Sequence, residues 1–256
     1  MATVPAPRGR TYVGSFYIAM AAIFVVVAFT AFAPSYWLRL PSGGFAGSPM
    51  LHLHGLLYSL WTLFFLSQAV LVASGRLRNH KAWGLAGISL ATAMVFVGLA
   101  VAVAGLERRV SLGHGDAARA FAIVPVTAAL LFGGLVAAAI ANLRRPEWHK
   151  RLMLVATAAL MQPAIARYLF IAGGRGDAAV RQAGPPPSVE FTMTGAYIAD
   201  AFIVAAILYD WKSRGRPHPA YLWGLGAVLA VQLSRPMFSR SEAWLRFADF
   251  LVAFNG

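Results

Sequence analysis

"WGLAGISLATAMVFVGLAVAVAG", residues 83–105, decides the fold, because it carries no charged side chain over the full length that one membrane crossing requires. A helix of about 20 apolar residues crosses the hydrocarbon core of a bilayer, which is about 30 Å thick. Inside that core every backbone polar group must be paired within the protein, as it is in a helix. A membrane-spanning β-barrel would show alternating segments of about ten residues instead. The sequence therefore predicts an all-α membrane protein.

The rest of the chain repeats this pattern. Hydrophobic residues make up 59% and charged residues 12% of the 256 residues, whereas a soluble domain is about 25% charged. We expect one transmembrane domain over residues 1–256, a polytopic membrane helix bundle of seven transmembrane helices. The predicted spans are 14–34, 51–74, 83–105, 119–142, 150–172, 188–210 and 219–237.

The first predicted span shares features with a cleavable signal peptide. Arg8 and Arg10 give it a basic start, and the residues AFA at 31–33 resemble a cleavage site. The apolar stretch is long for a signal peptide, however, and Pro34 would directly follow the cut. We therefore expect an uncleaved first helix.

The net charge of +13 has a membrane explanation. Lys and Arg collect at the cytoplasmic ends of membrane helices, where they face anionic lipid. That origin of the charge argues against nucleic-acid binding. Short basic clusters follow spans two, four and six and also precede span one, which predicts the N-terminus inside and the C-terminus outside. The clusters include Arg8, Arg10, Arg76, Arg78, Lys81, Arg144, Arg145, Lys150, Arg151, Lys212, Arg214 and Arg216.

Three histidines recur at a spacing of 69 residues, each preceded by an arginine four positions earlier. Each pair lies just before span three, five or seven, which suggests one lead helix followed by three repeated helical hairpins. Hairpins of similar length would place similar charged turns at similar intervals without any repetition, so both interpretations stay open. The pairs are Arg76 with His80, Arg145 with His149, and Arg214 with His218.

These three pairs favour anions over metal ions. Each lies at a helix N-terminus, the positive end of the helix dipole, among further Lys and Arg residues. Such a setting repels a divalent cation and attracts an anion, and the chain has no cysteine to ligate zinc. We expect Arg76, His80, Arg145, His149, Arg214 and His218 to contact anionic lipid headgroups and to bind no metal; plain structural turns are the alternative.

The C-terminal stretch 241–254 has the pattern of an amphipathic helix. Trp244, Phe247, Leu251 and Phe254 fall on one helical face, with charged residues off it. An interfacial helix on the outer membrane surface fits this pattern. A short helix that packs on the bundle is the alternative.

Polar residues within membrane spans are costly and are therefore the default candidates for a site. Span two carries a stripe of polar and aromatic residues, and Asp200 lies near the middle of span six. We expect a polar cavity in the outer half of the bundle, with Asp200 or Glu190 paired to Arg167 or Arg235; ion pairs without a ligand are the alternative. The candidate ligand-binding residues are His52, His54, Tyr58, Trp61, Gln162, Arg167, Glu190, Tyr197, Asp200, Gln232 and Arg235.

These residues favour a protein that binds a small hydrophobic or anionic ligand, or a redox cofactor such as haem or a quinone. A bis-histidine haem is weakly supported, because His52 and His54 have only the loop residue His114 as an outer partner. A transporter is an alternative, with Gln68 as the polar residue toward the inside, and so is an accessory or assembly subunit of a membrane complex. The sequence has no nucleotide-binding loop, nucleophile elbow or HExxH motif, so it assigns no enzymatic activity.

The motifs "LHLHGLLYSLW" at 51–61, followed by Gln68, and "HKRLM" at 149–153 resemble those of a widespread group of bacterial multi-span membrane proteins without an assigned activity. The resemblance covers most of the chain, although each motif alone is unspecific. It implies a location in the inner membrane and transfers no catalytic role. The adiponectin-receptor group shares a layout of seven helices, but its paired histidines in the last helix are absent here.

Overall fold

The computed structural model describes residues 9–45, 47–174 and 184–255, and within these ranges it contains helices and no strand. The all-helical prediction is therefore confirmed for this part of the chain. The helices are α1 (Gly9–Phe32), the 3-10 helix η1 (Trp37–Arg39), α2 (Pro49–Ala73), α3 (Leu77–Ser111), α4 (Gly115–Ala141), α5 (Pro146–Ala159), α6 (Gln162–Ala172), α8 (Val189–Arg214), α9 (Pro219–Phe238) and α10 (Glu242–Asn255).

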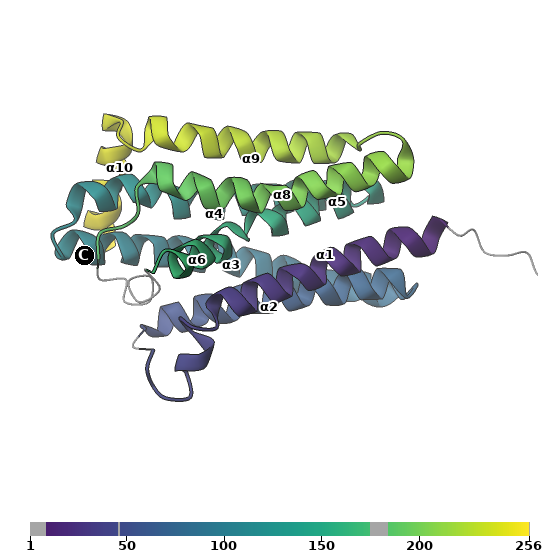
Figure 1. Cartoon of the computed structure of the whole chain (residues 1–256), viewed down its shortest axis with the longest axis horizontal. Coiled ribbons are helices and arrows are strands. Elements are labelled where there is room, and N and C mark those ends of the chain that lie inside the picture. Colours follow the sequence, from purple (N-terminus) through teal and green to yellow (C-terminus); the bar gives the residue numbers. More distant parts are fainter. Residues whose placement is uncertain (1–8, 46, 175–183, 256) are drawn as a thin grey trace, which may run out of the picture.

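Six segments of the described chain are long and apolar enough to cross a membrane. The protein is therefore built as a multi-pass membrane protein. The seventh predicted span, 219–237, coincides with α9, which is not among the six although it runs beside α8 along the bundle (Figure 1). The six segments are Gly14–Phe32, Pro49–Ala73, Leu77–Ser111, Gly115–Ala141, Pro146–Ala172 and Val189–Arg214.

The long helices run side by side, and the turns between them gather at two ends of the bundle (Figure 1). The turns α2–α3, α4–α5 and α8–α9 lie at one end, together with the start of α1. Because these turns carry the three arginine–histidine pairs, we call it the basic end. The segment with η1, the α3–α4 turn and α10 lie at the opposite end (Figure 1).

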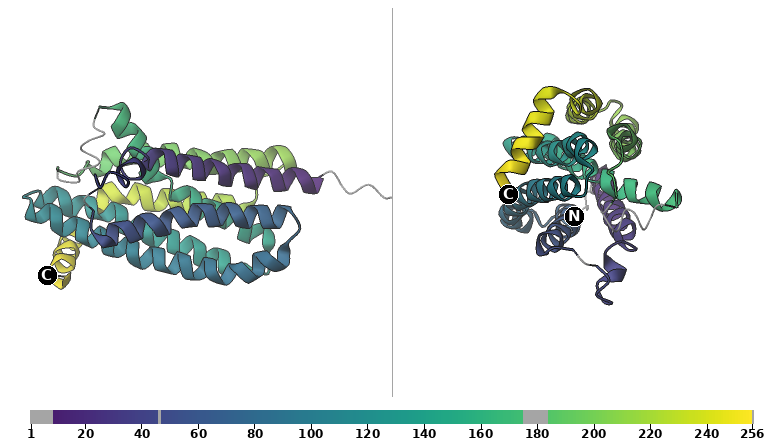
Figure 2. Two further views of the ribbon diagram at one scale, coloured as in Figure 1. Left: turned by 90° about the horizontal axis from the view of Figure 1, so that it is seen from below. Right: turned by 90° about the vertical axis from the view of Figure 1, so that its left-hand side faces the viewer.

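The fifth predicted span is broken in the middle. We expected one helix over 150–172, but α5 ends at Ala159 and α6 begins at Gln162, followed by Pro163. Proline lacks a backbone N–H, so Pro163 cannot donate to the Ala159 carbonyl oxygen, which explains why the helix is interrupted there. Beyond it, α6 projects from the bundle and packs against α8 and α1 (Figure 2).

The core between the helices combines large aromatic side chains with small residues. Trp61 and Phe132 meet edge to face at the centre, with ring centroids 5.0 Å apart. Gly224 on α9 lies so close to Val155 on α5 that an added Cβ would fall 3.0 Å from two of its methyl carbons. Close approach at small residues is the usual basis of helix packing in membranes.

The predicted C-terminal amphipathic helix exists as α10, which crosses the opposite end of the bundle (Figure 2). Trp244 and Leu251 pack against α3 and α4, and the Trp244 indole N–H donates to the Arg119 carbonyl oxygen (2.8 Å). Phe247 and Phe250 are exposed instead. The helix therefore packs on the bundle and also presents aromatic rings outward; the Phe254 side chain lies outside the described residues.

Candidate functional site

Four of the predicted ligand-binding residues come together inside the bundle. Gln162 at the start of α6, Asp200 on α8, and Gln232 and Arg235 on α9 are all buried. We call these four the polar network. Three different helices supply it, and the break in the fifth span places Gln162 within reach of α9.

Arg235 is the centre of the polar network, and its side chain is 1% exposed. Its Nη1 donates to Gln162 Oε1 (3.0 Å), and its Nε donates to Thr127 Oγ1 on α4 (2.9 Å). Gln162 in turn donates from Nε2 to the Thr192 carbonyl oxygen on α8 (3.4 Å). The guanidinium is therefore held by neutral oxygen atoms.

One of the two carboxyl oxygens of Asp200 has a hydrogen-bond partner in the described chain, and the other has none. Its Oδ1 accepts a hydrogen bond from Gln232 Nε2 (3.2 Å). Its Oδ2 and Gln232 Oε1 are buried and have no hydrogen-bond partner in the part of the chain that the structure describes. Buried polar atoms are nearly always paired, so two neighbouring acceptors without donors mark an unusual place in the fold.

The expected ion pairs in the outer half are replaced by other contacts. Glu190 is exposed and pairs with Arg240 (3.3 Å) rather than with Arg167 or Arg235. Arg167 lies over the Phe32 ring, 3.9 Å from its centroid, and its Nη1 donates to the Pro163 carbonyl oxygen (3.4 Å). Its Nε is buried without a partner among the described residues.

The polar stripe of span two lies apart from the polar network. His54 stacks on Tyr58 with ring centroids 4.1 Å apart, and the Tyr58 hydroxyl donates to the Met94 carbonyl oxygen (3.2 Å). Trp61 is buried in the core and donates from Nε1 to Thr157 Oγ1 (3.3 Å). Trp61 therefore serves packing, while the buried His54 Nδ1 has no partner within the described ranges.

Two further predicted site residues point elsewhere. His52 is hydrogen-bonded through Nδ1 to the Tyr36 hydroxyl (3.1 Å) in the segment between α1 and α2, and burial raises the pKa of Tyr36 above its usual value. Tyr197 on α8 is 47% exposed. Neither residue contributes to the polar network.

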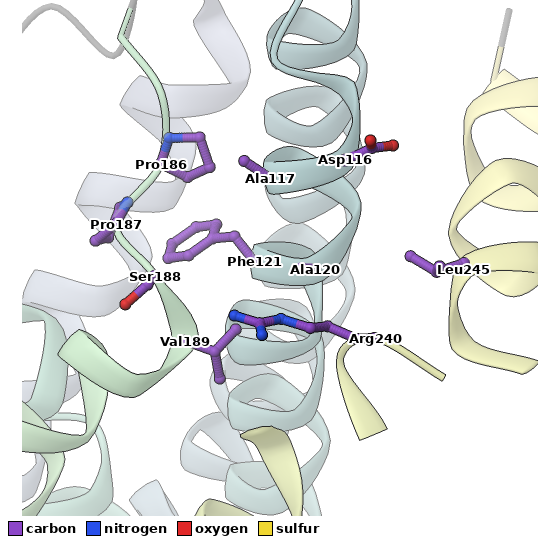
Figure 3. Close-up of a pocket in the computed structure, with 10 residues that line it drawn as sticks. All are labelled: Asp116, Ala117, Ala120, Phe121, Pro186, Pro187, Ser188, Val189, Arg240 and Leu245. Atoms are coloured by element: carbon purple, nitrogen blue, oxygen red, sulfur yellow. The ribbon is translucent and has the colours of Figure 1, made fainter. Parts of the chain in front are cut away.

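A pocket of about 340 Å³ lies at the opposite end of the bundle, where sequence reasoning placed no site (Figure 3). Phe121 and Val189 line its apolar wall, and Arg240 and Asp116 lie at its edge. Pro186 and Pro187, in the segment before α8, close one side (Figure 3). The polar network is not among the residues that line this pocket.

The basic end holds a buried ion pair that the sequence did not single out. Arg151 on α5 donates to both carboxylate oxygens of Asp210 on α8, through Nε (2.8 Å) and Nη2 (2.7 Å). Glu147 contacts Arg151, Lys150 (2.6 Å) and Arg214 (3.0 Å). A charge at the end of a predicted apolar span is the only signal that could have identified Asp210 in the sequence.

The three recurring histidines make three different contacts. His149 is hydrogen-bonded through Nδ1 to the Ala139 carbonyl oxygen (2.9 Å), and its ring lies 6.4 Å from that of His80. His218 Nδ1 accepts from the Ala220 backbone N–H (3.1 Å) and so caps α9. The described residues contain no group of three His, Cys, Asp or Glu side chains that could hold a metal ion. The paired arginines Arg76, Arg145 and Arg214 are exposed at this end.

The cap made by His218 is sensitive to pH. Burial, followed by the charges of Arg151 and Arg214, lowers the pKa of His218 below its usual value, with a smaller opposing effect of Asp210 and Glu147. Nδ1 accepts a hydrogen bond only when it carries no proton. The stabilisation that this cap gives is therefore complete above the unfolded-state pKa of histidine, about 6.5. It is lost as the pH falls from that value toward the lower pKa of His218 in the folded protein.

We expect the melting temperature of the wild type in detergent to fall more steeply below about pH 6.5 than that of His218→Asn. Asparagine keeps a side-chain cap and does not titrate, so it is the matched control. A cap is worth about 1 kcal/mol, which sets the scale of the difference. Parallel melting curves for the two proteins over pH would contradict the assignment.

Buried polar atoms without a partner in the described chain thus occur in the polar network and, separately, at His54 and Arg167. Comparisons of the chain with protein-family models, with curated proteins and with solved structures gave no match.

Proposed function

We propose that the protein binds a small ligand within the membrane, with the polar network as the binding site. The observation that supports this most is the buried Arg235 guanidinium, whose hydrogen bonds in the described chain go to the neutral oxygens of Gln162 and Thr127. A buried charge without a partner of opposite charge is costly. A bound anion would reduce this cost.

The broken fifth span supports the same site. Interrupted membrane helices often form substrate and ion sites, because the break frees backbone groups and the N-terminus of the second half-helix. Gln162 is the first residue of α6 and already holds Arg235 through its side chain. The site thus joins a half-helix terminus, a buried guanidinium and a buried carboxyl group.

The topology that we propose places this site in the outer half of the membrane. In this proposal α9 is the seventh span, the basic end faces the cytoplasm, the N-terminus is inside and the C-terminus is outside. The exposed Arg76, Arg145 and Arg214 at the basic end support this orientation by the positive-inside rule. They would contact anionic lipid headgroups of a bacterial inner membrane, and Phe247 and Phe250 of α10 would lie at the outer membrane surface.

The ligand is expected to be retained during mild purification and to be lost when Arg235 is replaced by glutamine. Gln removes the positive charge but keeps a polar side chain. Native mass spectrometry of the wild type and the variant, with an absorption spectrum to detect haem or quinone, measures the bound molecule.

Arg240→Gln is the matched control, since Arg240 is exposed and pairs with Glu190 (3.3 Å) outside the polar network. We expect it to retain the ligand as the wild type does. Equal melting temperatures of the three proteins would show that loss of ligand does not reflect misfolding. The same bound molecule, or no bound molecule, in all three would refute the proposed function.

A further inference from the structure

The two acceptors without a donor belong to side chains that already share one hydrogen bond. Gln232 Nε2 donates to Asp200 Oδ1 (3.2 Å), while Asp200 Oδ2 and Gln232 Oε1 are both buried and unpartnered in the described chain. A carboxyl group and a carboxamide are both planar and of similar size. Their remaining oxygens are the two positions at which a second hydrogen bond would close a ring.

An ionised carboxylate cannot form that second bond, because it only accepts hydrogen bonds, and the Gln232 Oε1 atom is also an acceptor. A protonated carboxyl group has one O–H donor. One proton on Asp200 Oδ2 therefore supplies the donor that Gln232 Oε1 lacks and also removes the unpaired charge from Oδ2. Burying an unpaired charge costs far more than burying a neutral group, so the protonated form fits this interior better.

The protonation of Asp200 also depends on the charged and polar groups near it. On α9, Arg235 is the charged side chain that interacts with it electrostatically, and the hydrogen-bond partners of Arg235 on α6 and α4 are the neutral Gln162 and Thr127. Arg235 directs its Nη1 and Nε to those two neutral groups. No ion pair between Asp200 and Arg235 occurs in the described structure, so the guanidinium does not act as a direct counter-ion.

We propose that Asp200 is held as a neutral carboxylic acid in a two-bond pair with Gln232, and that it thereby sets the charge of the binding site. Arg235 is then the only charge of the polar network. The site is a buried positive charge, which selects an organic anion with a carboxylate or phosphate group over a cation. This choice of ligand class rests on the proposed function, whereas the state of Asp200 does not.

Infrared spectroscopy of the purified protein near neutral pH tests the state of Asp200. We expect the carbonyl band of a protonated carboxylic acid in the wild type, with a downward shift in D2O, because the O–H proton exchanges. The band is expected to disappear in Asp200→Asn and to remain unchanged in the control Glu190→Gln. A wild-type spectrum without this band, or a band that persists in Asp200→Asn, would overturn the proposal.

The partner of the acid is tested by Gln232→Leu, which removes both hydrogen bonds of the pair but leaves the carboxyl group. We expect the band to remain and to move to higher frequency, as for an acid without a hydrogen-bonded carbonyl. An unmoved band would refute the pair with Gln232. Because the wild-type isotope shift needs no variant, misfolding of a variant does not remove the test.

The ligand class is tested on the molecule that native mass spectrometry finds bound to the wild type and lost from Arg235→Gln. An anionic molecule supports the proposed charge of the site, and a cationic one overturns it. If no bound molecule is found while the acid band is present, the proposed function fails and the protonation of Asp200 stands. If the band is absent while a ligand is bound, the protonation of Asp200 is refuted and the proposed function stands.

Discussion

Replacement of Asp210 by alanine is expected to lower the free energy of unfolding by about 3–5 kcal/mol, the usual cost of removing one partner of a buried ion pair. Arg151 is 1% exposed and gives two hydrogen bonds to Asp210, so the variant leaves a buried guanidinium whose one remaining ionic contact among the described residues is Glu147. Asp210 Oδ2 also accepts from the His218 backbone N–H (3.2 Å), and this bond is lost as well. Unfolding in mild detergent, followed by circular dichroism, measures the change.

Asp249→Ala is the matched control, because Asp249 pairs with Arg119 (2.6 Å) through an exposed carboxylate. Exposed ion pairs are worth about 0–1 kcal/mol, so this variant should be nearly as stable as the wild type. The double variant Arg151→Met, Asp210→Leu removes both charges and is expected to recover most of the loss. Equal effects of Asp210→Ala and Asp249→Ala would contradict the assigned importance of the buried pair.

Replacement of Trp61 by alanine is expected to be the second most destabilising change. Trp61 is 1% exposed, meets Phe132 edge to face and donates to Thr157. Truncating a large aromatic core residue to alanine lowers the free energy of unfolding by about 3–5 kcal/mol. We expect a loss of stability near the low end of that range, because lipid tails solvate the indole ring nearly as well as the core does. Most of the cost then comes from the cavity that the truncation leaves.

Trp223→Ala is the control for that experiment, since Trp223 lies on α9 and is 72% exposed. Its truncation leaves no cavity, and its effect should be small. The comparison also tests the sequence-based interpretation of Trp61 as a ligand-binding residue. If Trp61→Ala left the stability unchanged and removed the bound ligand, the packing role that the structure gives it would be wrong.

The helices of the fold could be predicted from hydropathy, but their ends and the break in the fifth span could not. The span 83–105 is found within the longer α3, because α3 continues as a helix beyond the apolar stretch into charged residues at both ends. The break at Gln162 was missed because Leu160, Met161 and Pro163 keep the segment apolar. Apolar composition indicates how favourably a segment transfers from water into lipid. It does not indicate whether the backbone continues as one helix.

The candidate site could be predicted only in part. Depth along the bundle grouped Gln162, Asp200, Gln232 and Arg235, and the structure brings these four together in the interior. Depth gives no direction around a helix axis, however. For that reason Trp61 and Tyr197 were assigned to the same cavity, although the structure places one in the core and the other on the exposed surface.

The hydrogen bond between Arg235 Nη1 and Gln162 Oε1 has a consequence for how α6 is held. Gln162 is the first residue of α6, and its side chain ties this half-helix to α9. A guanidinium carries five N–H donors, and the bonds to Gln162 and Thr127 take two of them. An anion can therefore bind Arg235 through the remaining N–H groups while Gln162 keeps α6 attached to α9, so binding does not require α6 to move.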